Sequence, residues 1–200
     1  MIITEIVENK AVMCTEDHFV GIGSTRKVYR WKDYVVKVNL HSIGHQQSIR
    51  ELEIYEYMQA NGFGELFAPT YYVDEEICIQ QYFPELPMMD HQSRYDIPEQ
   101  SDFRKFPNKY KECVELLDEK FDIFNIKDSS NYGLNEKSEL VFIDYGMSKK
   151  LYEDAWVPAA ENGDVPQIDV LACDKCGIVK EIRMYGEADS LVRCHSCGKE

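Results

Sequence analysis

The chain contains 200 residues, 44% of them hydrophobic, and carries a formal net charge of −14. This length fits one domain of ordinary size, or one domain beside a small module, and the hydrophobic content is sufficient for a packed core. The acidic charge argues against a general nucleic-acid binder, because that affinity depends on basic groups, and it suits protein partners. No hydrophobic run is long enough to span a membrane, and residues 1–10 lack the character of a signal peptide, so we expect a cytoplasmic location and no membrane contact.

Residues 19–38 are the first informative stretch, since they contain two glycines and a lysine within a β-branched run. Residues 1–18 give a weaker pattern that fits either a short edge strand or a helix. Gly21 and Gly23 lie between two strand-like pairs, and glycines allow backbone amides to approach a phosphate. Lys37 lies within the next strand-like run, where it can neutralise phosphate charge. A plain hairpin with a solvent-facing lysine explains the same residues.

A helix and two further strands are predicted next. Apolar residues over 46–60 recur with helical spacing, and the helix is expected to end at Asn61 and Gly62. The spacing assigns Ile49, Leu52, Tyr55 and Met58 to its buried face. Residues 66–73 and 77–83 are strand-like and are separated by an acidic turn. The first half of the chain is therefore expected to build a five-stranded sheet.

The second half predicts a loop, a helix and a short buried strand that ends in a carboxylate. Residues 84–106 are aperiodic and are expected to form a long loop with one short helical turn, whereas 107–121 are amphipathic and predict a helix. The apolar run 140–143 ends at Asp144, and Asn131 ends a polar turn before it. Carboxylate and amide oxygens are ligands that suit Mg²⁺, so these two residues predict a magnesium site.

Several of these features together resemble the protein-kinase-like superfamily over residues 18–150. Asn131, followed thirteen positions later by Asp144, Tyr145 and Gly146, is similar to the metal-binding asparagine and the Asp-Phe-Gly motif of that family. The paired glycines and the strand lysine are similar to its glycine-rich loop and its strand-3 lysine. The resemblance implies a two-lobed fold that binds ATP with Mg²⁺.

The resemblance also implies a role for individual residues. Lys37 would hold the phosphates of ATP and would be positioned by Glu51, for which Glu53 or an uninvolved surface glutamate is the alternative. Residues 80–83 would form the hinge that binds adenine, which makes Tyr82 a nucleotide-binding residue; a plain strand end is the alternative.

The chain departs from the family pattern at two places. Arg26 replaces the third glycine of the loop, so Arg26 or Lys27 would supply charge to the phosphates instead. No His-x-Asp motif is present, and Ile126 occupies the position of its aspartate. Asp128 is the candidate for a displaced catalytic base that takes the proton of a substrate hydroxyl. A capping or Asx-turn role for Asp128 is the alternative.

The C-terminal residues predict a separate zinc-binding module. Residues 147–154 are expected to form one small helix, and 155–168 a linker. After the linker, two Cys-x-x-Cys pairs resemble a zinc ribbon, with a glycine after each pair to permit the turn. The four ligands predicted for a structural Zn²⁺ are Cys173, Cys176, Cys194 and Cys197. A hairpin is expected between 178–185 and 191–193, and His195 is not expected to bind the metal.

We therefore predict an α+β protein with a kinase-like domain over residues 1–154, a linker over 155–168 and a small β zinc ribbon over 169–200. The C-terminal lobe is truncated, as in the reduced kinase-like proteins of bacteriophages and bacteria. The predicted function is phosphotransfer from ATP and Mg²⁺ to a hydroxyl acceptor, with a protein as substrate or partner. The first alternative is a weak or inactive pseudokinase scaffold whose ribbon recruits a partner protein. The second is small-molecule phosphotransfer, for which little chain remains to build a substrate pocket.

Overall fold

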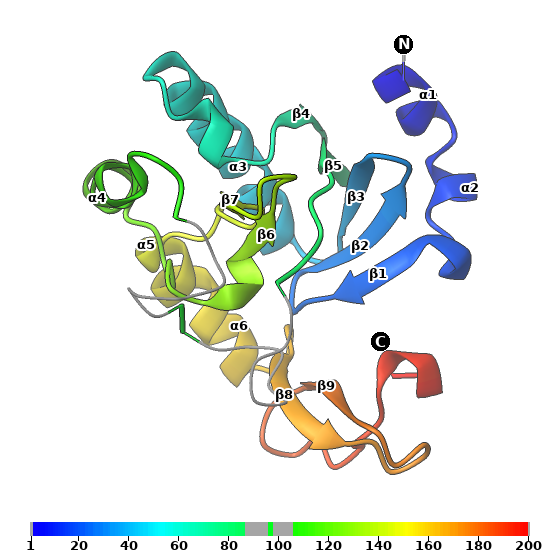
Figure 1. The fold of residues 1–200 in the computed structure, drawn as a ribbon. Helices are drawn as coiled ribbons and strands as arrows, with labels where there is room; N and C mark the ends of the chain where they lie inside the picture. Colours follow the sequence, from blue (N-terminus) through cyan, green and yellow to red (C-terminus); the bar gives the residue numbers. More distant parts are fainter. Residues whose placement is uncertain (1, 87–95, 98–105, 200) are drawn as a thin grey trace.

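The computed structural model describes residues 2–86, 96–97 and 106–199 of the chain. Its elements form a five-stranded sheet with one long helix, a mostly helical region beside them, and a small two-stranded hairpin near the C-terminus (Figure 1). The loop predicted over residues 84–106 falls largely outside the described residues. Among the helices that are described, none is both long and apolar enough to cross a membrane.

The large sheet is antiparallel throughout and has the strand order β1-β2-β3-β5-β4. Its strands are β1 (Phe19–Ile22), β2 (Arg26–Trp31), β3 (Tyr34–Asn39), β4 (Thr70–Val73) and β5 (Ile77–Gln81). The prediction of a five-stranded sheet is confirmed, although β4 begins later than expected because a 3-10 turn, Gly64–Leu66, precedes it. The inner strands β3 and β5 are apolar and largely buried, which suits β-branched side chains.

The N-terminal residues form two short helices that pack against the sheet. These are α1 (Ile2–Glu8) and α2 (Lys10–Met13), so the helix is the correct one of the two alternatives for this segment. The helices and the sheet share one apolar cluster, whose buried members are Ile6, Met13, Val36, Ile77 and Ile79.

Helix α3 (Ser42–Ala60) packs against β3, β4 and β5. The predicted helix is present, but its predicted buried face is wrong in part, because Ile49 is 40% exposed. The buried face also carries three polar side chains in its N-terminal half, namely Gln47, Ser48 and Glu51. Gln47 and Glu51 belong to the site described below, whereas Ser48 bonds to Asn39 and to the Gly44 carbonyl, and hydrophobic periodicity gives no signal for any of them.

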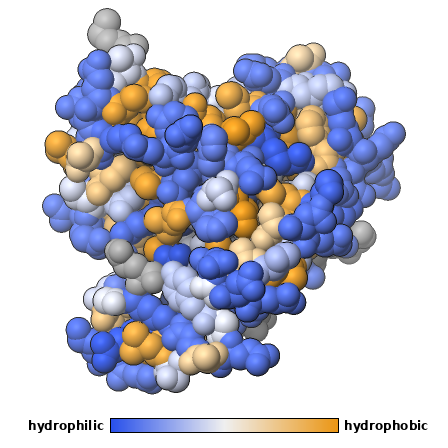
Figure 2. Space-filling view, turned by 180° about the vertical axis from the view of Figure 1, so that it is seen from behind, coloured by the Kyte–Doolittle hydropathy of each residue, from blue (hydrophilic) through white to orange (hydrophobic). Residues whose placement is uncertain are grey.

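The main core lies between α3, helix α4 (Tyr110–Phe121) and the small antiparallel pair β6 (Tyr132–Leu134) and β7 (Leu140–Phe142). Aromatic rings join these elements, and the Phe67 and Phe142 rings stack with centroids 5.0 Å apart. The outer surface is mostly hydrophilic on the face shown in Figure 2, where hydrophobic residues form small separate groups. This surface agrees with the net charge of −14.

A continuous helical segment follows the β7 turn. It comprises α5 (Lys149–Leu151), a π-helical turn (Tyr152–Trp156) and α6 (Val157–Glu161). The predicted linker is therefore helical as far as Glu161. Pro158 lies at the start of α6, directly after the π-helical turn, where the hydrogen-bond pattern of the segment changes.

The C-terminal module comprises residues 167–199 and contains strands β8 (Gln167–Ala172) and β9 (Val179–Met184). These strands pair with each other across the first Cys-x-x-Cys turn. The expected pairing of 178–185 with 191–193 is therefore wrong. The observed register places Ile182 opposite Asp169, and Ile182 is buried among the cysteines that form the core of the module.

Candidate functional site

A buried ion pair joins the centre of β3 to α3. The Lys37 Nζ atom lies 2.9 Å from Glu51 Oε1 and 3.1 Å from Glu51 Oε2, and it also donates to the Ile143 carbonyl at 2.7 Å. Glu51 is completely buried, whereas Glu53, the rival candidate, is exposed. The pairing of Lys37 with Glu51, expected from the sequence, is present in the structure. It connects the sheet, the long helix and the residue before Asp144.

Arg26 lies between the ion pair and Asp144. Its Nη2 atom donates to Asp144 Oδ1 at 2.6 Å and to Glu51 Oε1 at 2.9 Å. Burial disfavours the ionised form of Asp144, but the positive charges of Arg26 and Lys37 outweigh that cost, so the pKa of Asp144 lies below its ordinary value. The other terminal nitrogen of Arg26, Nη1, is buried and has no hydrogen-bond partner in the described part of the chain.

A polar network that the sequence did not reveal holds the other side of Glu51. Gln80 Nε2 donates to Glu51 Oε2 at 3.1 Å and to Thr70 Oγ1 at 2.9 Å. The Tyr145 hydroxyl lies 3.0 Å from Thr70 Oγ1 and donates to the Ala68 carbonyl at 2.7 Å. The network therefore couples the residue after Asp144 to the ion pair. The one available signal was the pair of glutamines that ends the otherwise apolar strand β5.

Gly146 is required by a close approach of two backbones. A Cβ atom at this position would lie 2.2 Å from the Gln47 carbonyl oxygen on α3. The Arg50 side chain fixes the same turn by donating from Nε to the Gly146 carbonyl at 3.1 Å. The turn that carries Asp144 is thus held directly against α3.

We expect Gly146→Ala to destabilise the protein by about 1–3 kcal/mol, because the added methyl group forces α3 and the turn apart. Gly21→Ala is the matched control, since a Cβ atom there meets no atom within 4 Å. Urea denaturation of both variants measures the difference. A Gly146→Ala variant no less stable than the control would contradict the close approach.

Two adjoining cavities open beside this network. The sheet cavity, of about 240 Å³, lies between the β1–β2 turn and the end of β5, and includes Gly21, Gly23, Val28, Lys37, Gln80, Tyr82, Ile143, Asp144 and Glu181. The module cavity, of about 450 Å³, lies between the same turn, the helical segment and β8, and includes Arg26, Lys37, Gln47, Asp144, Tyr152, Trp156, Gln167 and Asp169. Lys37 and Asp144 line both cavities, so the ion-pair network stands where the two meet.

The predicted glycines and Tyr82 all line the sheet cavity. The Gly23 amide closes the β1–β2 turn by donating to the Arg26 carbonyl at 2.8 Å. The Tyr82 ring lies 3.7 Å from the Arg30 guanidinium carbon, and its backbone amide donates to the Asp33 carbonyl at 2.8 Å. The Tyr82 amide is therefore already hydrogen-bonded within the protein, so it is the Tyr82 side chain, and not this amide, that can contact a ligand in the cavity.

Asp128 and Asn131 lie in one polar turn, and their side chains bond locally. The Asp128 carboxylate accepts from the Ser130 amide at 2.8 Å, the Ser130 hydroxyl at 2.7 Å and Asn125 Nδ2 at 3.0 Å. These bonds favour the capping interpretation of Asp128. Asn131 donates from Nδ2 to the Asn125 carbonyl at 2.8 Å, and its own carbonyl accepts from the Ile143 and Asp144 amides. These two backbone hydrogen bonds hold Asn131 beside Asp144.

The four cysteines of the C-terminal module come together as predicted. Their sulfur atoms all lie within 4.8 Å of one another, and a tetrahedral zinc site needs sulfurs about 3.8 Å apart. Gly177 and Gly198 have φ angles of +70° and +94°, which explains the glycine after each pair. Backbone N–H groups, above all that of Cys194, lower the pKa of Cys173 to about 6, which favours its thiolate, whereas burial raises the pKa of Cys197 to about 12. The cluster can hold a metal ion such as zinc.

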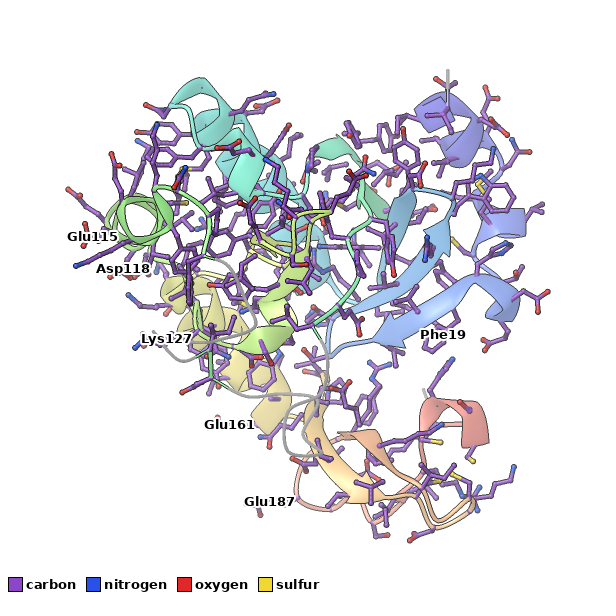
Figure 3. All side chains as sticks on the ribbon, in the orientation of Figure 1. Phe19, Glu115, Asp118, Lys127, Glu161 and Glu187 are labelled. Carbon is purple, nitrogen blue, oxygen red and sulfur yellow. The ribbon has the colours of Figure 1, made fainter. Side chains whose placement is uncertain are left out.

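The module packs against the first strand of the sheet and the β1–β2 turn. The His195 ring stacks on Phe19 with centroids 4.4 Å apart, and Phe19 is labelled at this edge of the sheet in Figure 3. Arg183 Nη2 lies 3.3 Å from the Ser24 carbonyl, and Trp156 Nε1 donates to the Ser24 hydroxyl at 3.0 Å. His195 contacts the sheet and is not a member of the cysteine cluster, as expected.

The fold and the site together define a mixed α+β protein with a five-stranded antiparallel sheet, a buried ion-pair network between two cavities, and a cluster of four cysteines that can bind a metal ion. Comparison with protein-family models and with curated proteins found no match to the chain.

Proposed function

We propose that this protein is a reduced protein-kinase-like phosphotransferase that uses ATP and Mg²⁺ and acts on a hydroxyl acceptor. The observation that carries the proposal is the buried pair of Lys37 and Glu51 beside Asp144, at a cavity that is also lined by Gly21 of β1 and Gly23 of the β1–β2 turn. A buried cation beside an open cavity is suited to the binding of phosphate groups, and phosphoryl transfer depends mainly on positioning and charge neutralisation.

Arg26 and Lys37 are the groups proposed to bind the phosphates. Lys37 is held by Glu51 and by the Ile143 carbonyl, so its ammonium group stays fixed at the cavity. Arg26 lines the module cavity and is bonded to Asp144, so its guanidinium charge lies close to the proposed phosphates. This position supports the earlier expectation that Arg26 supplies charge in place of a third glycine.

Asp144 and Asn131 are the residues proposed to hold Mg²⁺. The Asp144 side chain is 43% exposed, and only its Oδ1 atom accepts from Arg26. A carboxylate and an amide oxygen are a ligand set that Mg²⁺ accepts, with phosphates and water as further ligands. The ion would neutralise negative charge on the phosphates during transfer. Asp144 would also keep Arg26 oriented toward the same groups.

The residues that line the sheet cavity favour a nucleotide, and not free phosphate, as the ligand of this cavity. Val28, Val35 and Ile143 supply apolar surface, and Tyr82 and Glu85 line the end of the cavity near β5. An apolar slot with polar groups at both ends is the usual form of a small-molecule site. We propose that the base occupies this slot and that the phosphates lie toward Lys37.

We expect Lys37→Ala to weaken the binding of Mg·ATP at least tenfold, roughly the loss of one charge-assisted contact. The measurement is calorimetric titration of zinc-loaded protein. Lys111→Ala is the matched control, because Lys111 is an exposed lysine on α4. Equal affinity in the two variants, or no binding of Mg·ATP by the folded wild-type protein, would contradict the proposal.

A second candidate function is a scaffold that binds nucleotide without rapid turnover, with the zinc module as its partner-binding part. The engagement of Asp128 in three local hydrogen bonds favours it, because the carboxylate proposed as a base is not free for that role. Phosphate release and labelling of protein from γ-labelled ATP separate the two functions: an enzyme gives both above background, and a scaffold gives neither while still binding ATP.

A further inference from the structure

Strand β8 offers a free edge at the surface of the molecule. It belongs to a two-stranded sheet, and among the described residues only β9 pairs with it. Nearly all of its residues are exposed, and Val170 is 50% exposed. An exposed and partly apolar edge strand is a template for another strand, and proteins normally protect such edges with lysine, proline or covering elements. The sequence of β8, QIDVLA, contains neither lysine nor proline.

Exposed hydrophobic side chains are concentrated in the same module. Half of the large hydrophobic residues that are exposed in the described chain lie there, namely Val170, Leu171, Ile178, Val179 and Leu191. The register pairs Ala172 with Val179 and Val170 with Glu181, so Val170 and Val179 share one face of the hairpin. Exposed apolar side chains gathered on one small module mark an interaction surface.

The free strand leads into the module cavity. Residues 167–169, at the start of β8, line this cavity, and Lys37 and Asp144 line its opposite side. The cavity is built from the helical segment and β8, not from a C-terminal lobe. A chain lying along β8 would therefore pass directly beside the groups proposed to bind the transferred phosphate.

We propose that β8 binds an extended segment of a partner protein by strand addition, which carries that segment into the module cavity next to Asp144. The inference names the edge at which a protein acceptor of the proposed phosphotransferase docks, and it rests on that function. Strand addition draws its affinity from backbone hydrogen bonds and its selectivity from alternate side chains.

The charge of the site indicates a basic segment. Arg26 and Lys37 are bonded to Glu51 and Asp144, so the two positive and two negative charges of this network balance within the protein. Asp169 adds a negative charge to the cavity, and the whole chain carries −14. Complementary charge at such a surface contributes mainly to partner choice and association rate.

Trp156 allows the binding to be measured at the cavity itself. The chain contains two tryptophans, so a Trp31→Phe background leaves Trp156, a cavity residue, as the one fluorescent indole. The probe is the peptide Arg-Val-Arg-Ser-Val-Arg-Val, titrated without nucleotide. The first comparison peptide has glutamate in place of each arginine, and the second carries N-methyl groups on alternate backbone amides.

We expect the arginine peptide to change the Trp156 emission saturably, and both comparison peptides to bind at least about tenfold more weakly. Val170→Lys should weaken binding of the arginine peptide by a similar factor, because it replaces an exposed apolar side chain of β8 with a positive charge that repels the peptide. Val12→Lys is the matched control: Val12 is 68% exposed but lies on α2, and this variant should bind normally.

The proposal is overturned if the arginine peptide leaves Trp156 emission unchanged, if the N-methylated peptide binds equally well, or if both valine variants behave alike. A Val170-dependent dimer, detected by sedimentation, would assign the free edge to a second copy of the chain and also overturn it. Because no nucleotide is present in the titration, failure of peptide binding is distinguishable from failure of ATP binding, which the calorimetry tests separately.

Discussion

Replacement of Asp144 by alanine is expected to abolish phosphotransfer, lowering the rate by at least about a thousandfold, while the protein stays folded. The carboxylate lies where the two cavities meet, and it is the proposed ligand of Mg²⁺ as well as the partner of Arg26. Its side chain is 43% exposed, so its removal leaves no large buried void. The measurements are phosphate release from γ-labelled ATP and labelling of protein or peptide.

Asp154→Ala is the control for this prediction. Asp154 is an exposed aspartate that pairs with Lys150 on the helical segment and is not among the residues that line the two cavities. We expect this variant to keep full activity. Circular dichroism and zinc content would verify that the Asp144 variant is folded, and transfer retained in that folded variant would refute the assignment of Asp144.

Removal of the metal from the cysteine cluster is expected to unfold residues 167–199 and to weaken nucleotide binding. Structural zinc sites of this type contribute on the order of 10–16 kcal/mol to folding, and a module of this size has little apolar core to replace that energy. Its buried core consists of Cys173, Ile182 and Cys194. Cys194→Ser, or a chelator, should therefore remove hydrogen-exchange protection from β8 and β9.

The effect on the nucleotide site follows from contacts between the module and the β1–β2 turn. Arg183 Nη2 lies 3.3 Å from the Ser24 carbonyl, and Glu181 lines the sheet cavity. Loss of these contacts should lower Mg·ATP affinity by about tenfold. Cys14→Ser is the control, because Cys14 is a half-buried cysteine outside the cluster. Unchanged exchange protection after zinc removal would show that the module folds without metal.

Local sequence patterns were sufficient to predict the five strands of the large sheet, helices α3 and α4, and one residue pair of the candidate site. The β-branched runs predicted the five strands, and the apolar spacing predicted α3 and α4, because burial on one face imposes a period on the sequence. The spacing of the two Cys-x-x-Cys pairs predicted the cysteine cluster, since each pair needs only a local turn. The pairing of Lys37 with Glu51 was predicted because their order along the chain is similar to that of a paired lysine and glutamate in known proteins.

The tertiary structure decided the contacts between distant segments. Arg26 meets Asp144 across 118 positions, and Trp156 meets Ser24 across 132, and neither contact leaves a periodic or local signal. Gln80 and Tyr145 are held to Glu51 through hydrogen bonds that only the packed sheet and helix create. The sequence alone specified which residues could carry charge or bind metal. Their convergence into two adjoining cavities, with the C-terminal module as one wall, depends on packing between segments that local propensities do not encode.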